Sequence, residues 1–247
     1  MAFAGPPRGY GTGGRVGLIV PIDNAVIEPE LAEVPLDGMS FHVARIPTTD
    51  RDAMPERGIE ASRVFREMDC RAIVYACAET SFLGGVDANA VIIERIREAT
   101  GMPAITATWV MVEALRTLGI RSVGLVTPYT ATRGAVMEAF LGRSGIEVVA
   151  SAHRDFHEGS DDPREWLETN AQPPDTSHSM VRGLTDVNAD GYLISATNFA
   201  TMRGLDTLEA SMGRPVVSTN QAIVWWARRT LGIAGPVPGY GRLLEVE

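Results

Sequence analysis

The chain has 247 residues, a formal net charge of −9, 45% hydrophobic residues and 21% charged residues, which is typical of a globular enzyme. All 22 basic residues are arginine, so enzymes that need a lysine Schiff base, such as pyridoxal phosphate enzymes and lysine-dependent aldolases, are excluded. The acidic balance argues against nucleic acid and anionic membranes as partners, and no apolar stretch approaches the ~20 residues that span a bilayer.

The first 14 residues are rich in glycine and lack the apolar core of a signal peptide. They predict a flexible leader over 1–14 and a cytoplasmic protein. After the leader, short β-rich apolar runs alternate with helix-period segments, which predicts a parallel α/β fold. The expected strands are 15–21, 41–46, 72–77, 104–106, 122–127, 147–151, 192–196 and 216–218. The expected helices are 51–68, 87–99, 109–118, 130–141, 176–187, 205–212 and 221–231, and the proline- and glycine-rich segment 236–242 is expected to be irregular.

Three matched pairs of segments indicate an internal duplication. Gly17-Leu-Ile-Val-Pro21 matches Gly124-Leu-Val-Thr-Pro128, the strand ending at Cys77 matches the strand ending at Ala196, and Gly101-Met-Pro matches Gly213-Arg-Pro. The sequence therefore predicts two pseudo-symmetric lobes, each with a four-stranded parallel sheet flanked by helices, and an active site in the cleft between them. We expect 15–120 plus 219–247 to form the first lobe and 121–218 the second.

Cys77 ends a buried parallel strand, which is where α/β folds place their chemistry. The glycine- and hydroxyl-rich turn that follows predicts a thiol whose pKa is lowered by backbone N–H groups and a helix start. The alternative is an inert buried cysteine, which is the expectation for Cys70. In register with Cys77, the second half carries Ala196, so one strand end has a thiol and the other a methyl group.

Polar side chains follow the other strand ends. Asp23 and Asn24 follow the first strand, Tyr129 follows Pro128, and Thr197 and Asn198 follow Ala196. They are candidates for binding a small carboxylate whose α-carbon reacts, although Asp23 and Asn24 could equally be turn or cap residues. The two cysteines and four histidines lack the spacing of metal ligands, so neither a metal nor a cofactor is expected.

These segments resemble the aspartate/glutamate racemase superfamily, in its branch of maleate cis–trans isomerases and arylmalonate decarboxylases. The specific pieces are Gly17-Leu-Ile-Val-Pro-Ile-Asp-Asn24, Tyr75-Ala-Cys77, Thr127-Pro-Tyr129, Ser195-Ala-Thr-Asn198 and Pro238-Gly-Tyr-Gly-Arg242. The resemblance implies two α/β lobes, no cofactor, a homo-oligomer (a dimer or tetramer), and two strand-end positions that hold one or two cysteines.

The resemblance also implies roles. Cys77 matches the cysteine that adds to the substrate double bond in the isomerases, and Asn24 and Tyr129 match carboxylate-binding positions. The second cysteine position falls on Ala196, or on Thr197 if the alignment shifts by one. A further asparagine of the isomerases is expected near His157 and Glu158. The hydroxyl pair with which the decarboxylases bind the reacting carboxylate falls on Ala78 and Glu79, and Thr80 completes the expected substrate-binding set.

We therefore expect a cofactor-independent isomerase of a small (di)carboxylate with Cys77 as nucleophile. A racemase or decarboxylase acting on an amino acid, a hydantoin- or ectoine-derived acid or malonate is the alternative within the superfamily. A non-catalytic carboxylate-binding protein is the alternative from another class. Ala196 is either native or an introduced, inactivating change.

Overall fold

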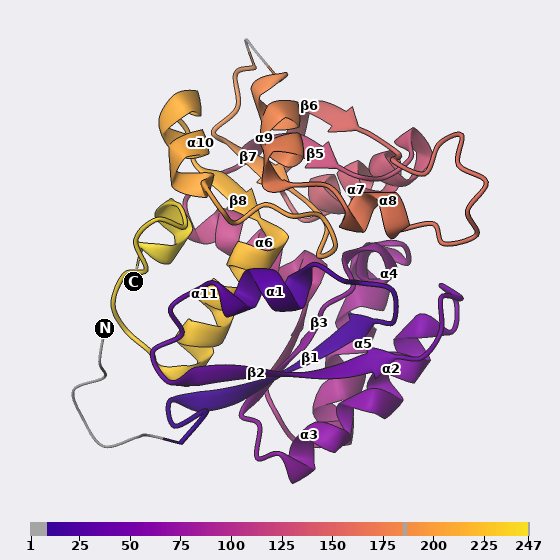
Figure 1. The fold of residues 1–247 in the computed structure, drawn as a ribbon, viewed down its shortest axis with the longest axis vertical. Coiled ribbons are helices and arrows are strands. Elements are labelled where there is room, and N and C mark those ends of the chain that lie inside the picture. The colour runs from indigo at the N-terminus through magenta and orange to yellow at the C-terminus, as the bar shows by residue number, and fades with distance from the viewer. Residues whose placement is uncertain (1–8, 185–186, 247) are drawn as a thin grey trace.

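The computed structural model describes residues 9–184 and 187–246, and it contains two four-stranded parallel sheets (Figure 1). The first sheet has the order β2-β1-β3-β4 and the second the order β6-β5-β7-β8. This confirms the predicted pair of α/β lobes. The strands are β1 (Gly14–Pro21), β2 (Met39–Ile46), β3 (Ala72–Tyr75), β4 (Ala104–Thr106), β5 (Ser122–Thr127), β6 (Glu147–His153), β7 (Gly191–Ile194) and β8 (Val216–Ser218).

Helices connect the strands and cover the sheets. They are α1 (Ile27–Ala32), α2 (Met54–Ser62), α3 (Val64–Glu67), α4 (Ala78–Phe82), α5 (Gly85–Thr100), α6 (Ala107–Thr117), α7 (Ala131–Arg143), α8 (Leu167–Asn170), α9 (Pro174–Arg182), α10 (Leu205–Met212), α11 (Thr219–Leu231) and the 3₁₀ turn η1 (Arg242–Leu244). Helix α11 leaves the second sheet and packs against α6, α1 and β3 (Figure 1).

The predicted elements differ from the observed ones in a few places. The helix expected over 51–68 is two helices, α2 and α3, and the Ser62 hydroxyl at the end of α2 donates to the Ile59 carbonyl, a bond that competes with the regular helix ladder. The short helices α1, α4 and α8 were not predicted. The two strands expected to reach Cys77 and Ala196 end two residues earlier, at Tyr75 and Ile194.

Some predictions fall partly outside the described residues. They are 1–8 of the expected leader, 185–186 of the second lobe and of the helix expected over 176–187, and 247 of the first lobe. The observed counterpart of that helix ends at Arg182. The assignment of segments to the two lobes stays a prediction. Within the described residues, no helix is long and apolar enough to cross a membrane.

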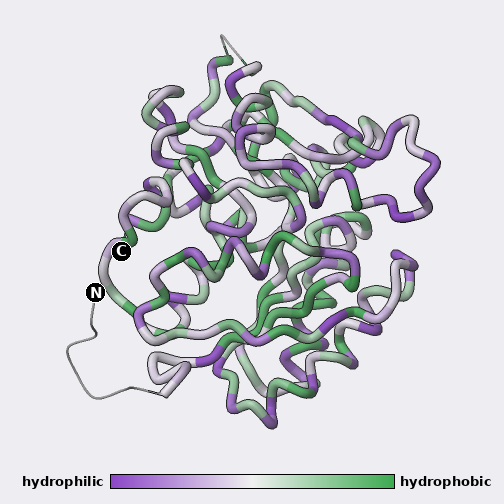
Figure 2. The backbone as a smooth tube through the Cα atoms, in the orientation of Figure 1, coloured by the Kyte–Doolittle hydropathy of each residue, from purple (hydrophilic) through white to green (hydrophobic). Residues whose placement is uncertain are grey.

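The central strands of the first sheet are buried on both faces. In β1, Val16, Leu18 and Val20 belong to a large core cluster that also contains residues of the second lobe, whereas Ile19 belongs to a smaller cluster under α2 and α5. This alternation is the period of two of a strand. Figure 2 shows the resulting hydrophobic band along the strands. Burial on both faces explains why these strands appear in the sequence as continuous apolar runs.

The backbone register supports the equivalence of Cys77 and Ala196. Tyr75 pairs with Ile19 in the first sheet, and Ile194 pairs with Val126 in the second. The next residue of each strand donates its N–H to the same partner, Ala76 to the Ile19 carbonyl and Ser195 to the Val126 carbonyl. Counted from these bonds, Cys77 corresponds to Ala196. The alternative assignment of the second cysteine position to Thr197 is therefore not favoured.

Candidate active site

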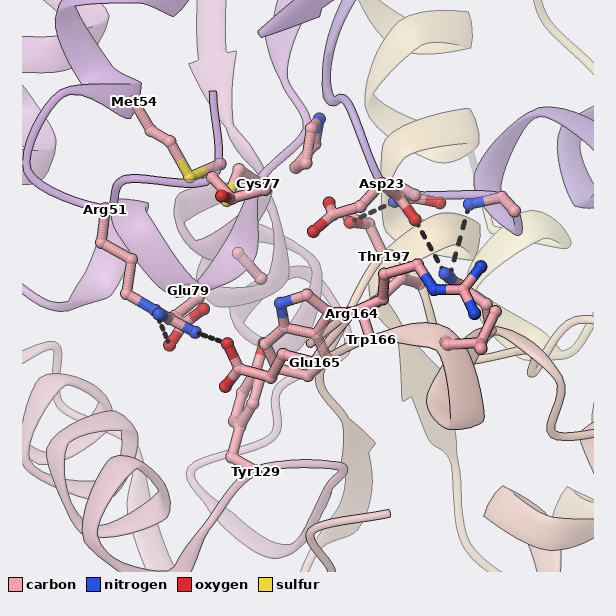
Figure 3. A pocket seen from close by; sticks show the side chains of 18 of the residues that line it. Asp23, Arg51, Met54, Cys77, Glu79, Tyr129, Arg164, Glu165, Trp166 and Thr197 are labelled. Atoms are coloured by element: carbon pink, nitrogen blue, oxygen red, sulfur yellow. Dashed lines mark hydrogen bonds and ion pairs between the residues drawn. The ribbon is translucent and has the colours of Figure 1, made fainter. Parts of the chain in front are cut away.

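A cavity of about 550 Å³ opens between the lobes at the carboxyl ends of the strands (Figure 3). This size lies within the range of small-molecule sites. It is lined by Pro21, Asp23, Asn24, Ala25, Thr49, Arg51, Met54, Cys77, Ala78, Glu79, Tyr129, Pro163, Arg164, Glu165, Trp166, Leu167, Asn170, Thr197 and Asn198.

The structure brings most of the candidate residues to this cavity. Those that line it are Asp23, Asn24, Cys77, Ala78, Glu79, Tyr129, Thr197 and Asn198. Ala196 and Thr80 do not line it and are both buried. The Thr80 hydroxyl instead bonds the Tyr75 phenol at 2.7 Å.

Cys77 is the N-cap residue of α4 and is only 5% exposed. The pKa of its thiol is raised to about 11, mainly by burial. Hydrogen bonds from Thr80 lower the pKa by less than burial raises it, and the charges of Glu79 and Asp23 raise it further. The expectation of a lowered pKa was wrong. The hydroxyl and the backbone N–H of Thr80, at the start of a five-residue helix, cannot offset removal from water and two nearby carboxylates. The thiol is therefore protonated at neutral pH.

This pKa predicts slow alkylation of Cys77 in the absence of ligand. With a pKa of about 11 instead of the ordinary 9.0, the thiolate fraction at pH 8 falls roughly a hundredfold. The rate of iodoacetamide labelling, followed residue by residue by mass spectrometry, should rise about tenfold per pH unit until the pH nears 11. Cys70, also with a pKa of about 11, serves as the internal reference. A labelling rate that levels off near pH 8 would contradict the assigned ionisation.

Asn24 and Thr197 join the two strand ends across the cavity floor. The Asn24 side-chain oxygen accepts the N–H groups of Val26 and Ile27, so Asn24 also stabilises the turn before α1, as its alternative interpretation as a turn residue predicted. Its amide donates to the Thr197 hydroxyl at 3.0 Å, and that hydroxyl donates to the Ala76 carbonyl. Ala76, the residue before Cys77, is therefore hydrogen-bonded to Thr197 of the second lobe. Within the described residues the Asn24 amide donates only to Thr197, so one of its two N–H groups is left for a ligand.

Tyr129 is buried between two aromatic rings. Its ring centroid lies 5.5 Å from that of Phe82 and 5.9 Å from that of Trp166. Burial raises the pKa of the phenol well above its ordinary value of 10.0. Tyr129 is therefore a neutral hydrogen-bond donor throughout the neutral range. Asn198 is a second neutral donor, and its amide bonds no group within the described part of the chain.

The loop after β1 is held by Asn170, which the sequence interpretation missed. The Asn170 amide donates to the Asp23 carbonyl at 2.7 Å, and its oxygen accepts the Ala25 N–H at 3.3 Å. An asparagine was expected near His157 and Glu158, neither of which lines the cavity. Burial raises the pKa of Asp23, an effect partly offset by a backbone hydrogen bond and reinforced by the charge of Glu165.

An ionic network of Arg51, Glu79, Arg133 and Glu165 closes one side of the cavity, and three of its members were missed. Glu79 Oε1 lies 2.8 Å from Arg51 Nε and 3.1 Å from Arg133 Nε. Glu165 Oε2 lies 2.5 Å from Arg51 Nη2, and its Oε1 binds Arg133 Nη1. Burial opposes ionisation of Glu165, but the bonds from both arginines outweigh it and lower its pKa. The position of Arg51 just beyond a strand end was the signal available in the sequence.

The cavity contains a protonated thiol, neutral amide and phenol donors, and ion-paired Arg51, Glu79 and Glu165. Within residues 9–184 and 187–246, no three histidine, cysteine, aspartate or glutamate side chains gather as metal ligands. Met54, Trp166 and Leu167 add apolar surface. Such a site can bind a small acid by its carboxylates and expose the neighbouring carbon to Cys77.

The fold and sequence match known proteins over almost the whole chain. The family model of arylmalonate decarboxylase matches residues 16–244. Arylmalonate decarboxylase of Bordetella bronchiseptica is 28% identical over 228 residues, which cover 92% of each chain. Maleate isomerase of Nocardia farcinica is 28% identical over 246 residues, covering 94% of this chain and 95% of the relative.

Solved structures match equally well. The unliganded arylmalonate decarboxylase has a TM-score of 0.79 at 26% identity, with 94% of this chain and 98% of the other covered. A second match is a cysteine-to-serine variant of the Nocardia farcinica maleate cis–trans isomerase, solved with a covalently bound succinylcysteine intermediate. It has a TM-score of 0.83 at 24% identity, with 94% of this chain and 98% of the other covered. The fold is that of this branch of the aspartate/glutamate racemase superfamily. The chain belongs to the arylmalonate decarboxylase family, whose matched members are decarboxylases and isomerases.

Proposed function

We propose that this protein is a cofactor-independent cis–trans isomerase of a small dicarboxylate, with Cys77 as the nucleophile. The observation that carries the proposal is the placement of the Cys77 thiol in a cavity with Asn24, Tyr129 and Asn198 as neutral donors. Positions 78 and 79, where the hydroxyl pair of a decarboxylase is expected, are an alanine and an ion-paired glutamate. The site therefore favours carboxylates that stay on the substrate.

The proposed reaction starts with loss of the thiol proton to Asp23. Asp23 is close enough for its charge to raise the pKa of Cys77, and its own pKa is raised; in Figure 3 its carboxylate points toward Cys77. The sulfur forms a bond to one alkene carbon, and the π electrons move to the other carbon and its carboxylate. Rotation about the resulting single bond follows. The C–S bond then breaks, the double bond re-forms in the trans geometry, and the proton returns to sulfur.

The donors of the cavity would stabilise the negative charge that develops on that carboxylate. Tyr129 is neutral and buried, which makes its hydrogen bond to a developing oxyanion stronger than in water. The succinylcysteine in the Nocardia farcinica variant is an adduct of the kind that this step requires. Ala196 leaves the opposite strand end without a titratable group, so Cys77 would act without a second thiol in this chain.

The test is proton NMR of maleate incubated with the protein, in which the proposal expects the fumarate signal to grow at the expense of the maleate signal. The Cys77→Ala variant is the control. Absence of fumarate and of a covalent adduct, in both the protein and its Ala196→Cys variant, would contradict the proposal. If maleate then only shifts the unfolding temperature, the non-catalytic binding protein is favoured.

A decarboxylase is the second candidate, because Cys77 is protonated and has no partner thiol. A thiol with a pKa of about 11 is suited to donate a proton to a carbanion left after loss of carbon dioxide. Incubation of a substituted malonate in D₂O would then give one enantiomer of the α-deuterated acid and one equivalent of carbon dioxide. A racemase with two bases is not favoured, since Ala196 cannot exchange a proton.

A further inference from the structure

The two arginines of the ionic network have an arrangement that a second substrate carboxylate could use. Arg51 follows β2 and Arg133 lies in the first turn of α7, so each lobe supplies one guanidinium group. Glu165 bridges them with one oxygen on each arginine. Paired guanidinium groups bind a free carboxylate in this manner. Glu165 thus occupies the position that an external carboxylate would take.

The two glutamates of the network differ in how firmly they are held. The Glu79 side chain is 8% exposed and belongs to α4, next to Cys77. Glu165 is 32% exposed and belongs to the connection between β6 and α8. If Glu165 moves out, Glu79 still neutralises one arginine, and one net positive charge remains in the network of Arg51, Arg133 and Glu79.

The segment around Glu165 forms one wall of the cavity. Pro163, Trp166 and Leu167 line it as well, and Trp166 packs edge-on against Tyr129. Arg133 binds Glu165 but does not line the cavity. Displacement of Glu165 would therefore both uncover Arg133 and enlarge the cavity beside Cys77.

We infer that Arg51 and Arg133 bind the distal carboxylate of a diacid substrate, and that Glu165 fills this subsite when no substrate is bound. The inference rests on the proposed function for its substrate class. Glu165 then competes with the ligand, so it lowers affinity for diacids and selects against monoacids, which gain nothing from displacing it. A ligand can displace Glu165 favourably only if its own carboxylate replaces the ion pairs that Glu165 makes with the two arginines.

The test is calorimetric binding of succinate and of butyrate, neither of which carries a double bond. Glu165→Gln keeps the side-chain size but removes the competing charge, so succinate should bind about tenfold more tightly while the affinity for butyrate stays within about twofold. Glu158→Gln is the matched control, because it removes the same charge from an exposed position on the same connection, outside the cavity. It should change neither affinity.

A second variant checks the arginines directly. Arg133→Gln should weaken succinate binding about tenfold or more and leave butyrate binding unchanged. Two outcomes would show that the inference is wrong and that the network only stabilises the contact between the lobes. In the first, Glu165→Gln lowers the unfolding temperature without changing the affinity for succinate. In the second, it tightens the binding of succinate and of butyrate equally. Because succinate is not turned over, these results are independent of whether maleate is isomerised.

Discussion

Replacing Cys77 with alanine is expected to lower kcat for the maleate-to-fumarate reaction by at least about a thousandfold. Among the described residues that line the cavity, Cys77 is the only cysteine, and removal of this nucleophile leaves only substrate binding and the groups that donate hydrogen bonds to the substrate carboxylates. The same loss is expected for Cys77→Ser, because a serine hydroxyl is far less acidic than a thiol. Initial rates by proton NMR or by absorbance measure the effect.

Cys70 provides the matched control for this prediction. It is 6% exposed where Cys77 is 5% exposed, and burial raises the pKa of both thiols to about 11. Cys70 precedes β3 at the opposite end of the strand, outside the cavity. Cys70→Ala should therefore keep kcat within about twofold. Equal losses in the two variants would show that general destabilisation, and not nucleophilic catalysis, explains the effect.

Placing a thiol at the second strand end is expected to raise turnover by about 10²- to 10⁴-fold, the usual contribution of a positioned acid or base. The variant is Ala196→Cys, since the backbone register aligns Ala196 with Cys77. A second thiol can hold and return a proton on the face opposite Cys77. Steady-state kcat/KM for maleate, or for the substituted malonate of the second candidate, measures the gain.

Because Ala196 is tightly packed, the Ala196→Cys variant needs a control for the effect of the added atom on stability. Ala196 is 1% exposed and its N–H donates to the Thr219 hydroxyl, so the added atom must fit a packed region. Overpacking of this kind costs about 1–3 kcal/mol, which a thermal melt would show. Ala196→Ser adds an atom of similar size without a titratable proton near neutral pH and should give no gain. An equal gain in both variants, or none in Ala196→Cys with a confirmed substrate, would refute the idea of a lost second thiol.

The sequence by itself determined the fold class and the asymmetry between the two strand ends. The central strands are buried on both faces, so continuous apolar runs marked them, and β4, β5 and β8 begin and end where predicted. The matched segments also aligned Cys77 with Ala196, because a duplicated sheet repeats its backbone register. Residues directly after strand ends, such as Asn24 and Tyr129, reached the cavity because parallel strands end at the same edge of their sheets.

The tertiary structure alone decided the ionisation of Cys77 and the composition of the cavity wall. The pKa of a thiol depends on burial and on charges such as Asp23, which lies more than fifty residues away in sequence. Arg51, Arg133 and Glu165 come from three separate segments, namely the loop after β2, helix α7 and the connection between β6 and α8, and no local pattern relates them. Asn170 and Trp166 likewise approach the first lobe only through folding. Local periodicity records which residues are buried, whereas the charges and donors that face one another across a cleft depend on how two lobes are packed together.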